Sequence, residues 1–223
     1  MATPYLHHTL ILREYHPKVA RKGLNPLPVL DKLGLLPFVK KVQFKSDVFN
    51  KTWVKPQIFN SHSLRNFSTL VGIQDLMIDD LDLSNFKKGA EKYFGHLSPT
   101  LRSVALNCPS GPLRQLLGFL RLFPKLDDIR IITYEASGKA GGKPDTPRWE
   151  LLRGKLTLSN FLEKTVLEKL IAAFGRIRFT SMNLTDVLET QLLLNACTET
   201  LQTLRLRLGS LFDFCKRFLK RIP

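Results

Sequence analysis

Residues 101–132 read LRSVALNCPSGPLRQLLGFLRLFPKLDDIRII and contain one spacing of apolar residues twice. The first copy of this L-x-x-L-x-L spacing is formed by Leu101, Val104 and Leu106. Because strand side chains alternate between faces, Val104 and Leu106 share one face of a short strand. Leucines at helical spacing follow, and Pro124 ends that predicted helix. The second copy is formed by Leu126, Ile129 and Ile131.

The same spacing recurs along the chain, with starts at residues 39, 73, 101, 126, 153, 174 and 201, although the copy at 153 has no apolar first residue. After the first interval, successive starts lie 21–28 residues apart, within the range of leucine-rich repeats, roughly 20–29 residues. The pattern predicts parallel strands of one sheet at 40–45, 74–79, 102–107, 127–132, 155–158, 175–180 and 202–207. Residues 9–12 are a candidate eighth strand at the N-terminal edge, and helical patterns cover residues 84–94, 160–174 and 184–196.

These elements predict an α/β fold: an irregular leucine-rich-repeat-like solenoid with parallel strands on the concave face and helices on the convex face. Residues 1–38 are expected to be an irregular N-terminal segment, and residues 39–208 to form the solenoid. A segment rich in Gly, Lys and Pro at 135–149 is expected to be a flexible insertion. Residues 209–223 form a basic amphipathic tail.

The composition indicates a folded, basic chain. Lys and Arg number 34 against 19 Asp and Glu, a formal charge of +15, which favours acidic partners. Three cysteines without close spacing predict neither a disulfide framework nor a zinc site, and a reducing compartment, cytoplasmic or nuclear, is expected. The longest apolar runs are too short for a membrane span, so no membrane partner is expected.

Sequence patterns for catalysis are weak, so the chain is predicted not to be an enzyme and to need no cofactor or metal. The run SGKAGGKP is one residue too short for a phosphate-binding loop, and Pro144 stands where Ser or Thr must contact the metal. Asp79, Asp80 and Asp82 fit a solvated turn better than a cation site. Cys108 has no evident histidine partner and is interpreted as a small buried thiol.

The solvent-facing residues of the predicted strands form the candidate binding surface. If Leu106 and Leu204 point into the core, the alternate residues of each strand point outward. The predicted partner-binding residues on this concave face are Arg130, Lys155, Arg176, Arg178, Arg205 and Arg207. Two interpretations remain open: a basic surface that recognises an acidic protein, and a solvated charged face that keeps the chain soluble.

The segment YFGHLSPTLRSVALNCPSGPLRQLLGFLRLFPKLDDIRI, residues 93–131, resembles the leucine-rich-repeat region of F-box proteins from mushroom-forming basidiomycete fungi. The stretches LVGIQDLMIDDLDL, LRGKLTLSNF, FGRIRFTSMNL and LLLNACTETLQTLRL are similar to the same group, and the resemblance covers residues 3–208. The helical F-box itself is not found in this sequence. The Asn or Cys that usually follows the strands is also missing, and its places hold Asp47, Leu81, Pro109, Tyr134, Met182 and Gly209.

The resemblance implies a non-catalytic protein-interaction module, the substrate-recognition repeat region of a Skp–Cullin–F-box ubiquitin ligase. Its partner would be a protein target, acidic in character, with a Skp-type adaptor bound only if an F-box lies upstream. The alternative is a basic nucleic-acid-binding module. A charge of +15 predicts non-specific nucleic-acid binding at low salt under either hypothesis.

Overall fold

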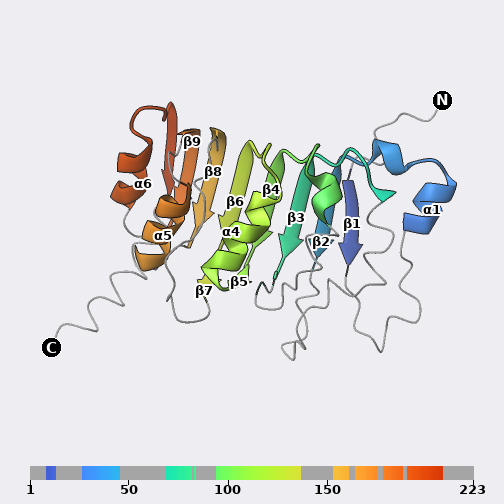
Figure 1. The fold of residues 1–223 in the computed structure, drawn as a ribbon, viewed down its shortest axis with the longest axis horizontal. Helices are drawn as coiled ribbons and strands as arrows, with labels where there is room; N and C mark the ends of the chain where they lie inside the picture. The colour runs from blue at the N-terminus through green and yellow to red at the C-terminus, as the bar shows by residue number, and fades with distance from the viewer. Residues whose placement is uncertain are drawn as a thin grey trace.

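The structure is a computed structural model of the 223-residue chain. It describes residues 9–13, 27–45, 69–81, 83, 94–136, 153–160, 164–174, 178–187 and 190–207. Within them, eight strands form one sheet in the order β1-β2-β3-β4-β6-β8-β9-β10, and each neighbouring pair is parallel (Figure 1). The strands are β1 (Thr9–Arg13), β2 (Lys41–Lys45), β3 (Asp75–Asp79), β4 (Ser103–Asn107), β6 (Asp128–Ile132), β8 (Arg153–Ser159), β9 (Arg178–Thr185) and β10 (Thr203–Arg207).

The predicted sheet is therefore confirmed as a single parallel sheet, and the candidate strand at residues 9–12 is its edge strand β1. The α/β class is confirmed as well. One predicted strand is placed wrongly, because β9 begins at Arg178 and continues to Thr185, beyond the predicted range 175–180. The helix predicted at 184–196 is correspondingly too long, since Leu184 is a buried residue of β9.

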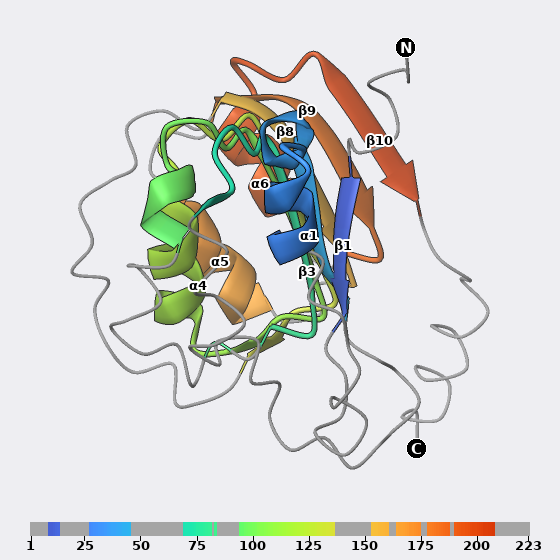
Figure 2. The ribbon, with the colours of Figure 1, turned by 90° about the vertical axis from the view of Figure 1, so that its right-hand side faces the viewer.

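The described helices lie on one side of the sheet (Figure 2). They are α1 (Leu27–Lys32), α4 (Leu113–Arg121), α5 (Lys164–Phe174) and α6 (Thr190–Cys197), with short 3-10 helices η3 (Leu36–Phe38) and η6 (Gly95–Leu97). Two further strands, β5 (Ser110–Gly111) and β7 (Glu135–Ala136), form a small parallel sheet of their own. Glu135 and Ala136, predicted to begin the flexible insertion, are thus ordered by β5; residues 137–149 lie outside the described residues.

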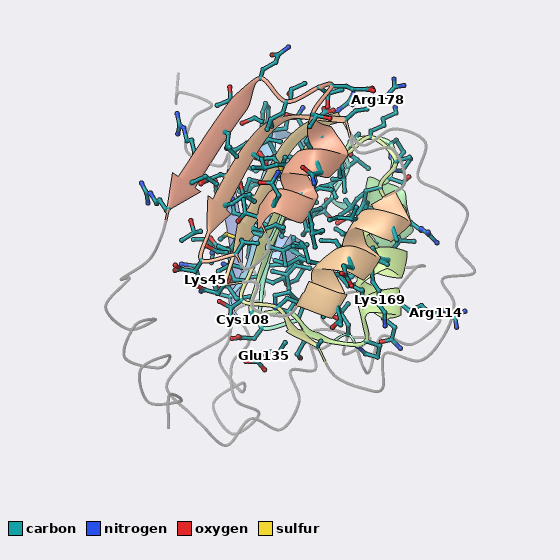
Figure 3. All side chains as sticks on the ribbon, turned by 90° about the vertical axis from the view of Figure 1, so that its left-hand side faces the viewer. Lys45, Cys108, Arg114, Glu135, Lys169 and Arg178 are labelled. Carbon is teal, nitrogen blue, oxygen red and sulfur yellow. The ribbon has the colours of Figure 1, made fainter. Side chains whose placement is uncertain are left out.

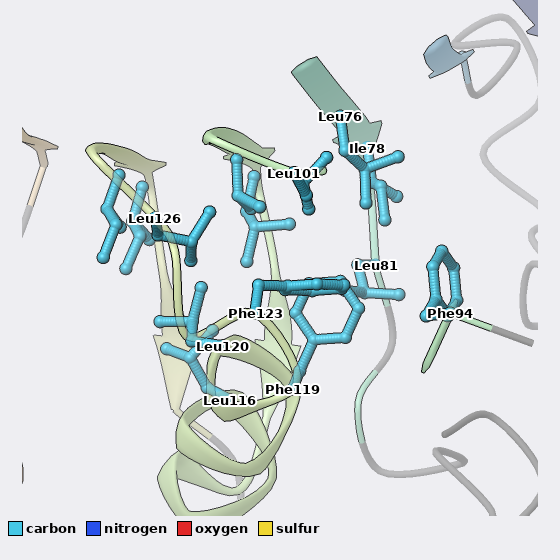
Figure 4. Close-up of a cluster of buried hydrophobic side chains, with 14 of the residues drawn as sticks. Leu76, Ile78, Leu81, Phe94, Leu101, Leu116, Phe119, Leu120, Phe123 and Leu126 are labelled. Atoms are coloured by element: carbon cyan, nitrogen blue, oxygen red, sulfur yellow. The ribbon is translucent and has the colours of Figure 1, made fainter. Parts of the chain in front are cut away.

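The hydrophobic core lies between the large sheet and the helices. In β2, β3, β4 and β6, alternate residues are buried and their neighbours are partly exposed, as expected for strands with one face in the core. Four residues of α4 complete the layer from the helix side: Leu116, Leu117, Phe119 and Leu120. Leu101 and Leu126, which open two copies of the sequence repeat, are buried beside them (Figure 4).

A residue in the left-handed backbone region follows each strand from β3 to β9 in the large sheet. These residues have φ between 51° and 56°: Asp80, Cys108, Thr133, Asn160 and Asp186. The N–H of each donates to the carbonyl of the last residue in the next strand, as Asp80 does to Asn107 at 2.8 Å. After each of these five strands the chain therefore leaves the sheet at the same position relative to the strand.

The last strand differs from the others in its burial. Leu106 is fully buried, as predicted, but Leu204 is 39% exposed, so the prediction that Leu204 is a core residue is wrong. Leu204 is in register with buried Met182 of β9. Because β10 is the last strand, no described element covers Leu204 from the far side.

Truncation of these two leucines tests this difference. We expect Leu106→Ala to lower the free energy of unfolding by roughly 2–5 kcal/mol, because it leaves a cavity in the core. Leu204→Ala should cost under about 1 kcal/mol, as a change at a partly exposed site. Urea denaturation of both variants measures the two losses, and equal losses would contradict the edge position of β10.

Candidate interaction surface

One face of the eight-stranded sheet carries no described helix, and we call it the open face. Its residues are the outward-pointing positions of each strand, which are partly exposed or exposed except Thr157. In strand order the open face consists of Thr9 and Ile11; Lys41, Gln43 and Lys45; Asp75, Met77 and Asp79; Ser103, Ala105 and Asn107; Asp128, Arg130 and Ile132; Lys155, Thr157 and Ser159; Ser181, Asn183 and Thr185; Thr203, Arg205 and Arg207.

Four of the six predicted partner-binding residues lie on the open face. Arg130 and Lys155 are on the adjacent strands β6 and β8, and both are partly exposed. Arg205 and Arg207 are on the edge strand β10 and are exposed. Strand β9 separates the two pairs and places the uncharged side chains of Ser181, Asn183 and Thr185 between them.

The other two predicted residues do not join them. Arg176 lies outside the described residues. Arg178 opens β9 and pairs with Arg153, before an irregularity in the pairing of β8 and β9. Figure 3 shows Arg178 at the end of the sheet where strands begin, opposite the end where Lys45 closes β2. The predicted outward pair of residues 176 and 178 is therefore replaced by Ser181 and Asn183.

A β-bulge explains this error. Gly154 pairs with Phe179 and Lys155 pairs with Ser181, so Thr180 is the extra residue, with no position opposite it on β8. Its hydroxyl donates to the Gly154 carbonyl oxygen at 3.2 Å. Phe179, Met182 and Leu184 are all buried and repeat the L-x-x-L-x-L spacing with a start at residue 179. The bulge adds one residue to β9, so that Ser181 and Asn183 take the open-face positions beside Lys155 and Thr157.

Charge on the open face is mixed. Basic residues stand on β2, next to the edge strand β1, and on the edge strand β10, with Arg130 and Lys155 between them. Acidic residues stand on β3 and β6: Asp75, Asp79 and Asp128. A continuous basic stripe, which the concave-face prediction implied, is thus interrupted by carboxylates. Opposite charges also stand side by side, since Lys41 is in register with Asp75 and Asp128 with Lys155.

Side-chain hydrogen bonds tie neighbouring strands together where they end. Asn107 Nδ2 donates to Asp79 Oδ1 at 2.6 Å, and Asn160 Nδ2 donates to Thr133 Oγ1 at 2.9 Å. The sequence pattern predicts the Asn or Cys that follows a repeat strand at the position eight residues after each repeat start, and that position is wrong by one. When the start at 174 is replaced by 179, the left-handed residues stand seven positions after their starts, and all five are small and polar.

The described cysteines are poor nucleophiles. Cys108 is exposed at the end of β4, which corrects the interpretation of a buried thiol. Partial desolvation and the carboxylates of Asp80, Glu135 and Asp79 raise the pKa of its thiol. Burial raises the pKa of the Cys197 thiol to about 11. Both thiols are therefore protonated near neutral pH, and the thiolate is the reactive form.

Other candidate sites find little support among the described residues. No group of three His, Cys, Asp or Glu side chains there is placed to hold a metal ion, and Asp79 is engaged by Asn107. The run SGKAGGKP begins at Ser137 and, like Asp82, lies outside the described residues. In the part of the chain that the structure describes, none of the helices has the length and apolarity of a membrane span.

Comparison of the chain with protein families, with curated proteins and with solved structures finds no match.

Proposed function

We propose that this chain is a non-catalytic protein-interaction module whose open face binds a protein target. The observation that supports it best is the one-sided covering of the sheet, with the described helices on one face (Figure 2). The residues of the other face are mostly polar. Parallel sheets usually have both faces covered by helices. A parallel sheet with an uncovered polar face is typical of repeat proteins, which bind partners on that surface.

We further propose that the architecture is an irregular leucine-rich-repeat-like solenoid. Consecutive strands are neighbours in the sheet, and each strand of the large sheet from β3 to β9 is followed by a left-handed residue. Helices α4, α5 and α6 follow β4, β8 and β9 in the chain. The units differ in length and in the residues after the strand, which is why the repeat is called irregular.

The resemblance to F-box proteins supports a more specific role. In such a protein the repeats hold the target while the F-box binds a Skp-type adaptor for ubiquitin transfer. Under this proposal the open face is the substrate-recognition surface, and Arg130, Lys155, Arg205 and Arg207 contact an acidic target. Such a ligase subunit would act in the cytoplasm or nucleus.

Site-specific photo-crosslinking tests the proposal. A photoreactive amino acid at Asn183 of the open face should form discrete protein adducts in cells, whereas the same residue at Arg114 of α4 should not. Arg130→Glu with Lys155→Glu should weaken binding of the purified adduct partner at least about tenfold, because charge pairs across an interface are reversed. Equal adducts at Asn183 and Arg114, or unchanged affinity, would contradict an open-face binding site.

The nucleic-acid alternative makes a different prediction. Readers of single-stranded nucleic acid stack bases on aromatic side chains, and the open face as described has no Trp, Tyr or Phe. Asp75, Asp79 and Asp128 would also repel phosphates. We expect DNA and RNA binding that falls to the non-specific range, Kd about 10⁻⁴–10⁻⁶ M, at physiological salt. Submicromolar, sequence-selective binding in a fluorescence-anisotropy titration would favour the alternative.

A further inference from the structure

The free edge of β10 is the least covered part of the described sheet. All five residues of β10 are exposed, whereas every other strand of the large sheet whose burial is known has buried residues. At the opposite edge, Leu10 of β1 is 7% exposed, while Leu204 and Leu206 are 39% and 53% exposed. Among the described strands, β10 pairs with β9 alone, so its other side has no partner among them and carries backbone groups that a further strand can pair with.

The two faces of β10 have different chemistry. Arg205 and Arg207 point to the open face, in register with the uncharged Asn183 and Thr185 of β9. Leu204 and Leu206 point to the helix side, in register with buried Met182 and Leu184. No carboxylate among the described residues forms an ion pair with either arginine. A ninth strand would therefore meet alternating cationic and apolar side chains.

We propose that β10 binds an extended acidic segment of the target protein, which adds to the sheet as a ninth strand. Added strands gain affinity from backbone hydrogen bonds and specificity from alternate side chains. Asp or Glu at every second position would face Arg205 and Arg207. Apolar residues at the intervening positions would cover Leu204 and Leu206. The inference rests on the proposed function, since it names the chemistry of the target and the edge where it binds.

Charge argues against the two other occupants of this edge. A second copy of the chain pairing through β10 would place arginines beside arginines in a parallel arrangement, and Arg205 beside Arg205 in the centred antiparallel one. The chain's own continuation after residue 207 carries Lys216, Arg217, Lys220 and Arg221. Like charges in paired strands are unfavourable. An acidic segment from another protein has the complementary sign.

Peptide binding to the full chain tests the proposal. The probe is a fluorescein-labelled seven-residue peptide in which Glu and Val alternate, measured by anisotropy at about 150 mM salt, where screening limits long-range attraction. The control peptide has the same composition with Glu and Val in separate blocks. We expect saturable binding of the alternating peptide and at least about tenfold weaker binding of the blocked one. Equal binding of both would overturn the proposal, since only net charge would then matter.

Charge-reversal variants locate the site. Arg205→Glu with Arg207→Glu should weaken the alternating peptide at least about tenfold and should bind a peptide with Lys in place of Glu. The matched control is Lys32→Glu with Arg114→Glu, two exposed positions on α1 and α4, which should leave binding unchanged. If the double glutamate variant unfolds, Arg205→Gln with Arg207→Gln replaces it. Loss of binding in the control variant, or no gain of the Lys peptide, would overturn the proposal.

N-methylation separates strand addition from simple ion pairing. Methyl groups on alternate amides along one edge of the peptide should abolish binding, while methyl groups along the other edge should be tolerated. Tolerance of both patterns would overturn the proposal. Failure of the strand-addition proposal can be told apart from failure of the proposed function. If only strand addition fails, the photo-crosslinked adducts at Asn183, and the dependence of partner binding on Arg130 and Lys155, would persist.

Discussion

Replacing Phe119 with alanine is expected to lower the free energy of unfolding by about 3–5 kcal/mol, because it removes a large buried side chain and leaves a cavity. Phe119 lies on α4 and is fully buried. Its ring packs edge-on against Phe94 at 5.5 Å between ring centroids and against Phe123 at 5.4 Å (Figure 4). It therefore joins α4 to the segment before η6 and to the segment that leads into β6.

Phe38→Ala is the matched control. It removes the same atoms from η3 at a position that is 50% exposed, so its cost should be well below that of Phe119→Ala, under about 1 kcal/mol. Urea denaturation followed by circular dichroism measures both values. Equal losses would contradict the central position of the aromatic cluster. A change in m-value for Phe119→Ala would show that the cooperativity of the single core depends on it.

Much of the sheet could be predicted from the sequence because the repeat spacing reports directly on strand alternation. The burial of Leu101, Val104 and Leu106 could be predicted without knowing which strands lie beside them, because three buried positions at that spacing fit one strand start. Each parallel neighbour then aligns the same three positions, as Val104 aligns with Ile129 and Leu106 with Ile131. Local pattern and global pairing agree here, which is typical of foldable sequences.

The register of β9 could not be predicted in the same way. Phe174, Ile177 and Phe179 fit the spacing, and so do Phe179, Met182 and Leu184. A single strand's pattern cannot choose between the two phases. The choice depends on β8, because its register with β9 shifts between Gly154 and Lys155 and brings Ser181 beside Lys155. The earlier phase places Arg176 and Arg178 on the surface, whereas the observed phase places Ser181 and Asn183 there.

The open edge at β10 was missed for a different reason. Leu204 and Leu206 have the same spacing as the core residues of every other repeat. Burial of a residue, however, depends on the next unit of the stack as well as on its own, because each repeat covers its neighbour. The last described strand, β10, lacks that cover. The apolar spacing that marks buried residues in the other strands therefore marks exposed residues in β10.

The backbone at Gly154 admits no side chain, and Gly154 lies directly before the register shift between β8 and β9. Gly154 has φ +106°, a conformation that residues with a Cβ rarely adopt. An added Cβ would overlap the carbonyl oxygen of Asp127 and lie 2.9 Å from its carbonyl carbon. That carbonyl oxygen is held in place by the N–H of Lys155 at 2.7 Å. The clash is therefore with fixed backbone, which cannot move aside as a flexible side chain would.

Gly154→Ala is accordingly expected to destabilise the fold by about 2–5 kcal/mol, from the left-handed backbone, roughly 1–2 kcal/mol, and from overpacking, roughly 1–3 kcal/mol. Gly118→Ala is the matched control, because an added Cβ on this exposed position of α4 meets no atom within 4 Å. Alanine there should raise stability by about 0.5–1 kcal/mol, since glycine is a poor helix former. Thermal and urea unfolding should show a loss of stability for Gly154→Ala and a gain for Gly118→Ala. A neutral Gly154→Ala would contradict the close approach of the Gly154 backbone to the Asp127 carbonyl, and with it the course of β8 at the register shift.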